Sequence, residues 1–148
     1  MTKRTFEDIE EGAVHDLGSF RAEEAEMRAF AERYDPQPIH VDPEAAADSI
    51  FGGIIASGWY TASCCMRLLV DGFFNDTVSM GAFGMEELRW KTPVRAGDTV
   101  AVELAIAKKT QSDSRDDRGY VDVDVTATNQ DGEEVVYWRA TNIIGTRQ

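Results

Sequence analysis

The sequence predicts an α+β fold in which helices come first along the chain and an antiparallel sheet follows. Apolar residues keep a helical spacing up to about residue 70, whereas after about Ser79 they alternate with polar residues, as in half-buried strands. The run Gly58–Val70 is apolar nearly all round, which is typical of a buried helix. With 148 residues, the chain is expected to form one domain, residues 1–148, with a substantial core.

The first half of the chain predicts one strand followed by helices. Residues 13–22 mix apolar and polar residues and indicate a strand. Glu23–Tyr34 has the spacing of an amphipathic helix, with acidic residues at its start that suit the helix dipole, and Pro36 ends it. Asp42 is then a candidate N-cap for a short helix, Pro43–Asp48, which leads through a glycine-containing turn into the buried helix.

The second half of the chain predicts strands joined by turns. Valines alternate with aspartates and threonines in one segment, and two further segments behave similarly. Gly97-Asp98 and Asp131-Gly132 have the composition of turns, and the charged segment Ser112–Gly119 that of a solvated loop. These elements favour an antiparallel meander with strands over Thr99–Ala107, Val121–Thr128 and Glu134–Ile144.

Charge is the strongest compositional anomaly, with 27 acidic residues against 15 basic ones and a formal net charge of −12. The acidic residues are spread along the chain, which argues against nucleic acid or an anionic membrane as partner. A halophilic source, where salt screens self-repulsion, is favoured over an ordinary acidic protein. No run approaches the roughly 20 apolar residues of a membrane span, and no signal peptide is recognisable, so a cytoplasmic location is expected.

The only two cysteines, Cys64 and Cys65, are adjacent within the apolar helix. Neighbouring residues on a helix point about 100° apart and bridge poorly, so both are predicted to be buried apolar residues. No further Cys or His stands at ligand spacing, so no metal site is expected.

The segment Tyr34–His40 carries a candidate catalytic pair, Asp35 and His40. Pro36 and Pro38 fix their own φ angles and bias the residues before them toward extended conformations, so a stiff, non-helical turn is predicted. Such a turn lets both polar side chains converge on one point. A carboxylate beside an imidazole is a common arrangement for proton transfer, which makes these two residues the predicted acid–base pair.

Residues 35–42, Asp-Pro-Gln-Pro-Ile-His-Val-Asp, resemble the hydratase motif of the MaoC-like dehydratases, the (R)-specific enoyl-CoA hydratases of hot-dog fold. The usual family form is Asp-x-Asn-Pro-x-His, so Gln37 departs from it. Gly53–Gly58 is similar to the family's Pro/Gly-Ile-x-His/Ser-Gly segment, and Leu88–Val94 to its strand ending in Pro-Val. The resemblance covers roughly Ala29–Val100.

The resemblance implies an antiparallel sheet wrapped around a long central helix. It also implies (R)-specific hydration of trans-2-enoyl-CoA to 3-hydroxyacyl-CoA, or the reverse dehydration. Asp35 and His40 would hold a water between them, and the Gly58 N–H, at a helix N-terminus, would stabilise charge on the thioester oxygen. Ser57 is expected to cap this helix or touch the thioester, and Gln37 to hold the loop through its amide.

The implied reaction needs no metal and no redox cofactor, because coenzyme A is part of the substrate. The resemblance further implies a homodimer or a multiple of it. Four residues are candidates for an acyl tunnel: Trp59, Phe83, Met85 and Trp90. Five basic residues are candidates for the CoA phosphates: Arg67, Arg89, Lys91, Lys108 and Lys109.

Two other functions stay open. An acyl-CoA thioesterase shares the fold class, but such enzymes tend to carry a carboxylate on the buried helix, and Gly58–Val70 contains no Asp or Glu. A non-catalytic acyl-CoA-binding module would tolerate loss of Asp35 or His40, and both are present.

Overall fold

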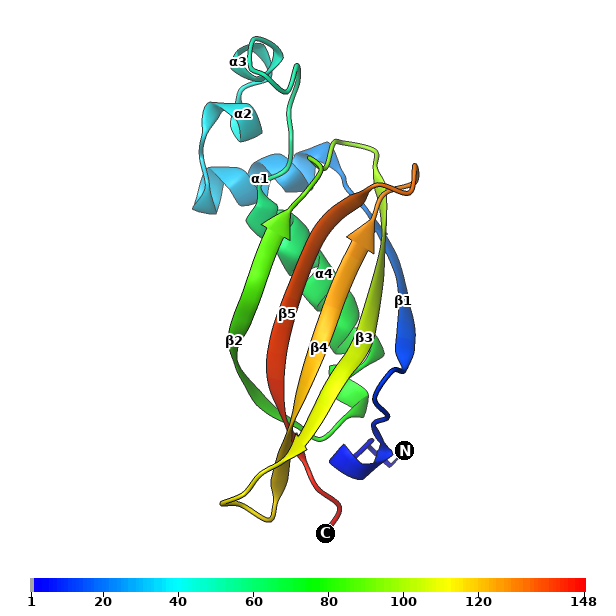
Figure 1. Cartoon of the computed structure of the whole chain (residues 1–148). Helices are drawn as coiled ribbons and strands as arrows, with labels where there is room; N and C mark the ends of the chain where they lie inside the picture. The colour runs from blue at the N-terminus through cyan, green and yellow to red at the C-terminus, as the bar shows by residue number, and fades with distance from the viewer. Residues whose placement is uncertain (1) are drawn as a thin grey trace.

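The computed structural model describes residues 2–148 and has a five-stranded antiparallel sheet that curves around one long helix, α4 (Gly58–Gly72) (Figure 1). The strand order is β1-β3-β4-β5-β2. This arrangement confirms the predicted α+β class. The strands are β1 (Val14–Arg21), β2 (Ser79–Trp90), β3 (Thr99–Gln111), β4 (Arg118–Thr128) and β5 (Glu134–Gly145).

Three helices gather at one end of the sheet, and both termini lie at the other end (Figure 1). They are α1 (Glu24–Tyr34), α2 (Pro38–Val41) and α3 (Pro43–Ala47); two 3₁₀ turns, Phe6–Asp8 and Phe74–Asp76, complete the fold. The predictions for α1 and α3 are confirmed. Asp42 caps α3, because its carboxylate accepts hydrogen bonds from the N–H groups of Glu44 and Ala45.

The prediction of a wholly non-helical turn up to His40 is wrong, since α2 forms one helical turn that contains His40. Pro38 is the first residue of α2. Proline is tolerated there because the first N–H of a helix has no intrahelical acceptor, and its fixed φ already suits the helix. The stiffening effect of the prolines therefore remains, but it places His40 on a short helix.

The expected simple meander is only partly correct. Strands β3, β4 and β5 are successive neighbours, but β2 pairs with β5 at the edge of the sheet. The second edge of β3 is already occupied by β1, whose register runs from Val14 opposite Ala105 to Arg21 opposite Thr99. The segment between β2 and β3 therefore crosses the end of the sheet, where it helps to build the site.

The core lies between α4 and the concave face of the sheet. Inward-facing residues of β3, β4 and β5 are buried together with Cys65 and Leu69 of α4. The sequence predicted that helix α4 is buried on all sides. It is not, because Trp59 is 54% exposed and Met66 is 39% exposed. The helix also runs two residues further than predicted and so includes Asp71, which is paired with Arg67 at 2.7 Å on the surface.

Candidate active site

Asp35 and His40 converge next to the N-terminus of α4. Asp35 is the C-cap of α1, and its N–H donates to the carbonyl of Ala31. His40 lies on α2, which begins only three residues later. The Oδ2 atom of Asp35 and the Nε2 atom of His40 are 3.4 Å apart. This separation is long for a direct hydrogen bond but lets both atoms contact one small molecule.

Two hydrogen-bond donors fix the Asp35 carboxylate. The Gln37 amide donates to Oδ1 at 2.7 Å, and the Ser57 hydroxyl donates to Oδ2 at 2.7 Å. These hydrogen bonds, that of Gln37 first and that of Ser57 second, hold the pKa of Asp35 below its ordinary value, and the charge of His40 adds a smaller lowering effect. Asp35 is therefore an ionised carboxylate in a fixed orientation.

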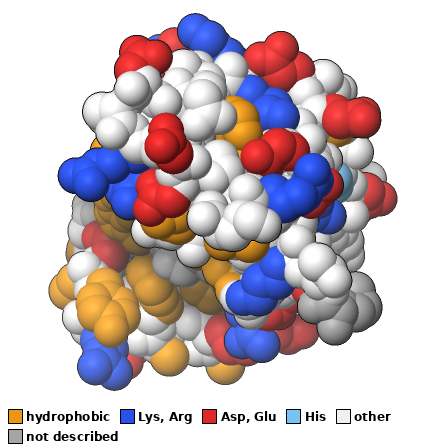
Figure 2. All heavy atoms as spheres, turned by 90° about the horizontal axis from the view of Figure 1, so that it is seen from below, with side chains coloured by type: hydrophobic (Ala, Val, Ile, Leu, Met, Phe, Trp, Pro, Cys, Tyr) orange, Lys and Arg blue, Asp and Glu red, His pale blue; other side chains and the backbone are white. Residues whose placement is uncertain are grey.

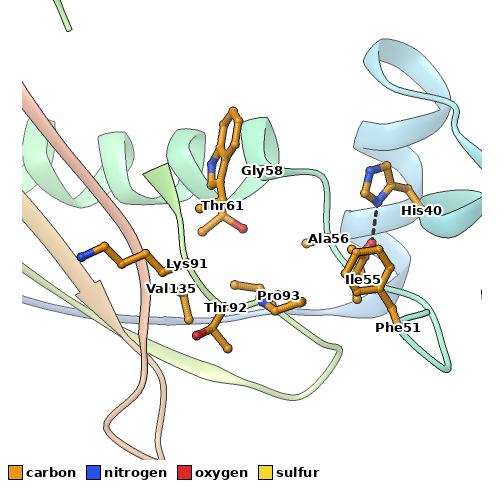
Figure 3. A pocket seen from close by; sticks show the side chains of 12 residues that line it. His40, Phe51, Ile55, Ala56, Gly58, Thr61, Lys91, Thr92, Pro93 and Val135 are labelled. Atoms are coloured by element: carbon orange, nitrogen blue, oxygen red, sulfur yellow. Dashed lines mark hydrogen bonds between the residues drawn. The ribbon is translucent and has the colours of Figure 1, made fainter. Parts of the chain in front are cut away.

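The orientation of the His40 ring is set by a backbone carbonyl. His40 is only 5% exposed, and its Nδ1 lies 2.8 Å from the carbonyl oxygen of Ile55 (Figure 3). A carbonyl oxygen can only accept, so Nδ1 carries the proton. In the neutral ring, Nε2 is then the unprotonated nitrogen, and this is the nitrogen that faces Asp35.

Residues 55–57 join the separate parts of the site. The Ile55 N–H donates to the carbonyl of Ile39 on α2, and the Ala56 N–H donates to the carbonyl of Val94 in the segment after β2. Ser57 then reaches Asp35 while its hydroxyl oxygen also accepts from the Trp59 N–H and so caps α4. The expected capping role of Ser57 is confirmed, and its contact to Asp35 was not predicted.

A cavity of about 280 Å³ opens beside His40 (Figure 3). His40 approaches it from α2 and Thr61 from α4, while Lys91, Thr92 and Pro93 approach from the segment that follows β2. Sequence reasoning missed most of this lining, because small apolar and hydroxyl side chains carry no motif of their own. The remaining lining residues are Phe51, Ile55, Ala56, Gly58, Trp90, Val94 and Val135.

Gly58 is the first residue of α4 and lines this cavity. Within residues 2–148 its N–H forms no hydrogen bond, as expected for the first donor of a helix. The Trp90 ring packs so closely on Gly58 that a Cβ there would lie 2.3 Å from Cε2 of the indole. Glycine is thus required by packing as well as by any approach of a ligand to the N–H.

The structure places only some of the candidate acyl-tunnel and phosphate-binding residues at the cavity beside His40. Trp90 lines the cavity beside His40, whereas Phe83 and Met85 line a different one and Trp59 lines neither. Of the five candidate phosphate-binding residues, only Lys91 lines the cavity beside His40, and its ammonium is paired with Glu134 at 2.9 Å. Lys108 and Lys109 are at the far end of β3.

Across residues 2–148, no group of three or more His, Cys, Asp or Glu side chains is placed to hold a metal ion. None of the helices in this part of the chain is both long and apolar enough to cross a membrane.

Residues 4–130 match the family described as the MaoC like domain. The chain therefore belongs to the MaoC-like dehydratase family, in agreement with the resemblance of its motifs. The crystal structure of the MaoC-like dehydratase from Rhodospirillum rubrum is 40% identical in sequence, with a TM-score of 0.89 over 97% of this chain and 98% of that one.

Two further proteins are similar over most of this chain. The (R)-hydratase from A. caviae is 29% identical, with a TM-score of 0.73 over 90% of this chain and 96% of its own. It shares the antiparallel sheet wrapped around a helix, which confirms the hot-dog fold. A 3-hydroxybutyryl-CoA dehydratase of Methylorubrum extorquens is 33% identical over 70% of this chain and 64% of its own. The chain spans only 22% of the length of Klebsiella aerogenes protein MaoC.

Proposed function

We propose that this protein is an (R)-specific 2-enoyl-CoA hydratase, or the corresponding 3-hydroxyacyl-CoA dehydratase in the reverse direction. The observation that carries the proposal is the convergence of the Asp35 carboxylate and the His40 ring beside a cavity, with Oδ2 and Nε2 3.4 Å apart. The similarity to an (R)-hydratase and to a 3-hydroxybutyryl-CoA dehydratase supports the same reaction.

In the proposed mechanism, Asp35 and His40 hold one water molecule between Oδ2 and Nε2. Because Nδ1 of His40 donates to the Ile55 carbonyl, Nε2 is the ring nitrogen that can accept, and we assign it as the acceptor for a proton of that water. The water oxygen then bonds to the β-carbon of the enoyl group. The proton held by the pair is delivered to the α-carbon on the same face, which completes the addition of one water.

Negative charge develops on the thioester oxygen during this addition. The Gly58 N–H has no acceptor within residues 2–148 and stands at the N-terminus of α4, where the helix dipole favours an anion. We assign it as the donor to that oxygen; one such donor is typically worth about 10²–10³ in rate. These steps use only side chains, one backbone N–H and water, so the proposed reaction takes coenzyme A as part of its substrate and uses no metal or redox cofactor.

The test is incubation with crotonyl-CoA while the absorbance of the conjugated enoyl thioester is followed. Wild-type protein is expected to hydrate crotonyl-CoA, and Asp35→Asn and His40→Ala are each expected to lose about 10²–10⁴-fold in kcat/KM. Chiral analysis of the product is expected to give the (R) alcohol. Release of free CoA thiol without hydration would instead indicate a thioesterase, and binding without turnover an acyl-CoA-binding module.

His15 offers a matched control for His40, because it is the only other histidine of the chain. Its ring packs edge-on against Phe73 at 5.0 Å and does not line the cavity beside His40. His15→Ala is expected to keep the hydratase rate and to lose some stability. Equal loss of rate in both histidine variants would contradict the assignment of His40.

A second copy of the chain is the proposed partner. Strand β2 is an edge strand whose residues are almost all exposed, and an unpaired strand edge is a ready template for association. Met80, Phe83, Met85 and Trp90 are 43–68% exposed on it. Light scattering after size-exclusion chromatography is expected to give a dimer or a multiple of it, and Phe83→Glu to shift the mass toward the monomer.

A further inference from the structure

Thr61 of α4 carries a buried hydroxyl that the proposed mechanism does not use. The residue is only 2% exposed and lines the cavity beside His40. Its N–H donates to the carbonyl of Ser57, but its hydroxyl has no hydrogen-bond partner within residues 2–148. Only two unpartnered side-chain atoms of these residues are fully enclosed, on Tyr60 and Asn142, so the Thr61 hydroxyl has access to open space. That space is the cavity.

The other buried serines and threonines of residues 2–148 satisfy their hydroxyl groups within the fold. Each of them donates or accepts a hydrogen bond: Ser57, Thr77, Ser112 and Thr146. A buried hydroxyl without a partner is destabilising, because it has lost its hydrogen bonds to bulk water. Thr61 is therefore the exception among them, and its hydroxyl is available to a ligand.

The position of Thr61 on α4 places this hydroxyl beside the proposed donor to the thioester oxygen. Thr61 follows Gly58 by three residues, and residues so spaced are neighbours on one face of a helix. Side chains of a helix lean back toward its N-terminus, so Thr61 covers the first turn of α4. In Figure 3 its hydroxyl points toward the N-terminal end of α4 and toward Ala56. The hydroxyl and the Gly58 N–H therefore face the same part of the cavity.

The other main hollow of the molecule does not reach Thr61. Figure 2 views the end that carries both termini and shows hydrophobic side chains gathered on one side. A second cavity, of about 220 Å³, lies between α4 and β2 and is bordered by Met66 and Leu69 of α4. It shares no lining residue with the cavity beside His40. A ligand that pairs with Thr61 is therefore held next to the candidate acid–base pair.

We propose that Thr61 is a further catalytic residue, whose hydroxyl donates to the thioester oxygen alongside the Gly58 N–H. This inference rests on the proposed hydratase function and deepens it. The carbons of an enoyl group accept no hydrogen bond, and the water is assigned to Asp35 and His40. The thioester oxygen is thus the acceptor left for the hydroxyl, and it lies at the helix end that favours negative charge.

The proposed contact strengthens as the reaction proceeds. The thioester oxygen is a neutral acceptor in the bound substrate and gains negative charge as water adds to the β-carbon. A donor already fixed at this point therefore stabilises the transition state more than the ground state. Thr61 transfers no proton in this role, so Asp35 and His40 keep the acid–base chemistry.

The first test replaces Thr61 by valine, which keeps the branched shape and removes the hydroxyl. With crotonyl-CoA, kcat of Thr61→Val is expected to fall by about 10²-fold with little change in KM, as for loss of one donor to a developing oxyanion. Thr61→Ser retains a hydroxyl and is expected to keep most of the rate. An unchanged kcat in Thr61→Val, or a rise in KM at constant kcat, would overturn the inference.

Thr77 is the matched control, because its buried hydroxyl donates to the carbonyl of Phe73 and accepts from Arg4. Thr77→Val is expected to melt at a lower temperature and to keep the hydration rate. Thr61→Val is expected to show the opposite pattern, with an equal or higher melting temperature, because no hydrogen bond of the fold is lost. A lower melting temperature together with a lower rate in Thr61→Val would indicate a structural role and overturn the inference.

Infrared spectroscopy tests the acceptor directly. In Asp35→Asn, which is expected to hydrate crotonyl-CoA slowly, the stretch of a ¹³C-labelled thioester carbonyl is expected to move to lower frequency on binding, because its donors polarise it. Thr61→Val in the same background is expected to reverse part of that shift, and an identical shift in both proteins would overturn the assignment to the thioester oxygen. Absence of crotonyl-CoA hydration by wild-type protein would instead contradict the hydratase function itself.

Discussion

Asp35 and Asp124 are two carboxylates of similar exposure, 18% and 23% for their side chains, and both have a pKa below the ordinary value. Asp124, on β4, accepts from the Tyr137 hydroxyl at 2.6 Å and from two guanidinium nitrogens of Arg139 at 2.8 and 2.9 Å. Asp35 accepts from an amide and a hydroxyl and faces an imidazole.

The difference is in how the negative charge is balanced. Arg139 is always charged, so Asp124 is part of a permanent ion pair in which no proton needs to move. Asp35 is held by neutral donors, and its only cationic neighbour would be His40 after that ring has gained a proton. A lowered pKa alone therefore does not distinguish the carboxylate that we propose as catalytic. Asp35 differs from Asp124 in having no permanent counter-charge and in lying beside an imidazole.

Replacing each carboxylate by its amide should give opposite results. Asp35→Asn is expected to lose about 10²–10⁴-fold in hydration rate with little change in thermal unfolding, since the amide still fits among its neighbours. Asp124→Asn is expected to keep the rate and lose about 1–2 kcal/mol of stability, because Arg139 loses a charged acceptor. Loss of the crotonyl-CoA hydration rate in Asp124→Asn would contradict the distinction between the roles of Asp35 and Asp124.

Ser57→Ala should lower both the hydration rate and the stability of the protein by a moderate amount. It removes a donor to Asp35 and the N-cap of α4 at once. We expect kcat to fall roughly tenfold, and the free energy of unfolding to fall by about 1 kcal/mol. Ser57→Thr keeps the hydroxyl and is the corresponding control. An unchanged rate in Ser57→Ala would show that Asp35 does not depend on this contact.

The Asp124 ion pair should weaken only in acid. The pKa of Asp124 is lowered in the folded protein, above all by the hydrogen bond from Arg139, so its stabilising effect is present above the unfolded-state value of about 3.9. That effect is lost as the pH falls through the lower folded value. The difference in unfolding free energy between wild type and Asp124→Asn should thus be constant near neutral pH and vanish in strong acid.

Gln37 is expected to lower the pKa of Asp35 through the hydrogen bond from its amide. The hydrogen bond from Gln37 is the largest cause that lowers the pKa of Asp35, so Gln37→Leu is expected to raise that pKa toward its ordinary value. Gln37→Asn restores the residue usual in the family and is expected to keep part of the lowering. Carboxyl ¹³C NMR titration measures both, and an unchanged Asp35 titration in Gln37→Leu would contradict the geometry.

The smallest expected effect is that of overall charge on the melting temperature. With a formal net charge of −12, self-repulsion should make the melting temperature rise by a few degrees between low and high salt. A melting series in potassium chloride tests this prediction, and with it the halophilic source. A melting temperature that is independent of salt would remove the idea.

Local chemistry made several features predictable from the sequence. The α1 and α3 helices follow from amphipathic spacing and from the Asp42-Pro43 cap, and α4 from its apolar run. The convergence of Asp35 and His40 was predictable because the two residues are close in sequence within a recognisable motif. Each of these predictions depends on residues within a few positions of one another.

Features set by distant contacts were not predictable in the same way. The Ser57–Asp35 contact joins residues 22 positions apart, and the placement of β2 beside β5 depends on β1 having already taken the edge of β3. Asn142 takes an inward-facing position of β5 between Ala140 and Ile144, and only the structure shows that its Nδ2 has no partner within residues 2–148. Sequence patterns indicate which face of the sheet a residue takes, but not whether a hydrogen-bond partner lies opposite its polar atoms.

Residues 55–57 form one hydrogen bond each to His40, to the segment after β2 and to Asp35. The loop just before them has few such hydrogen bonds. In that loop Ile50 is 95% exposed and Gly52 has a positive φ, yet Phe51 lines the cavity beside His40. Substitutions at residues 48–53 can therefore reshape this part of the cavity wall while Asp35 and His40 keep their positions. For an evolving lineage or a protein engineer, this loop is the place where new substrates can be admitted without rebuilding the chemistry.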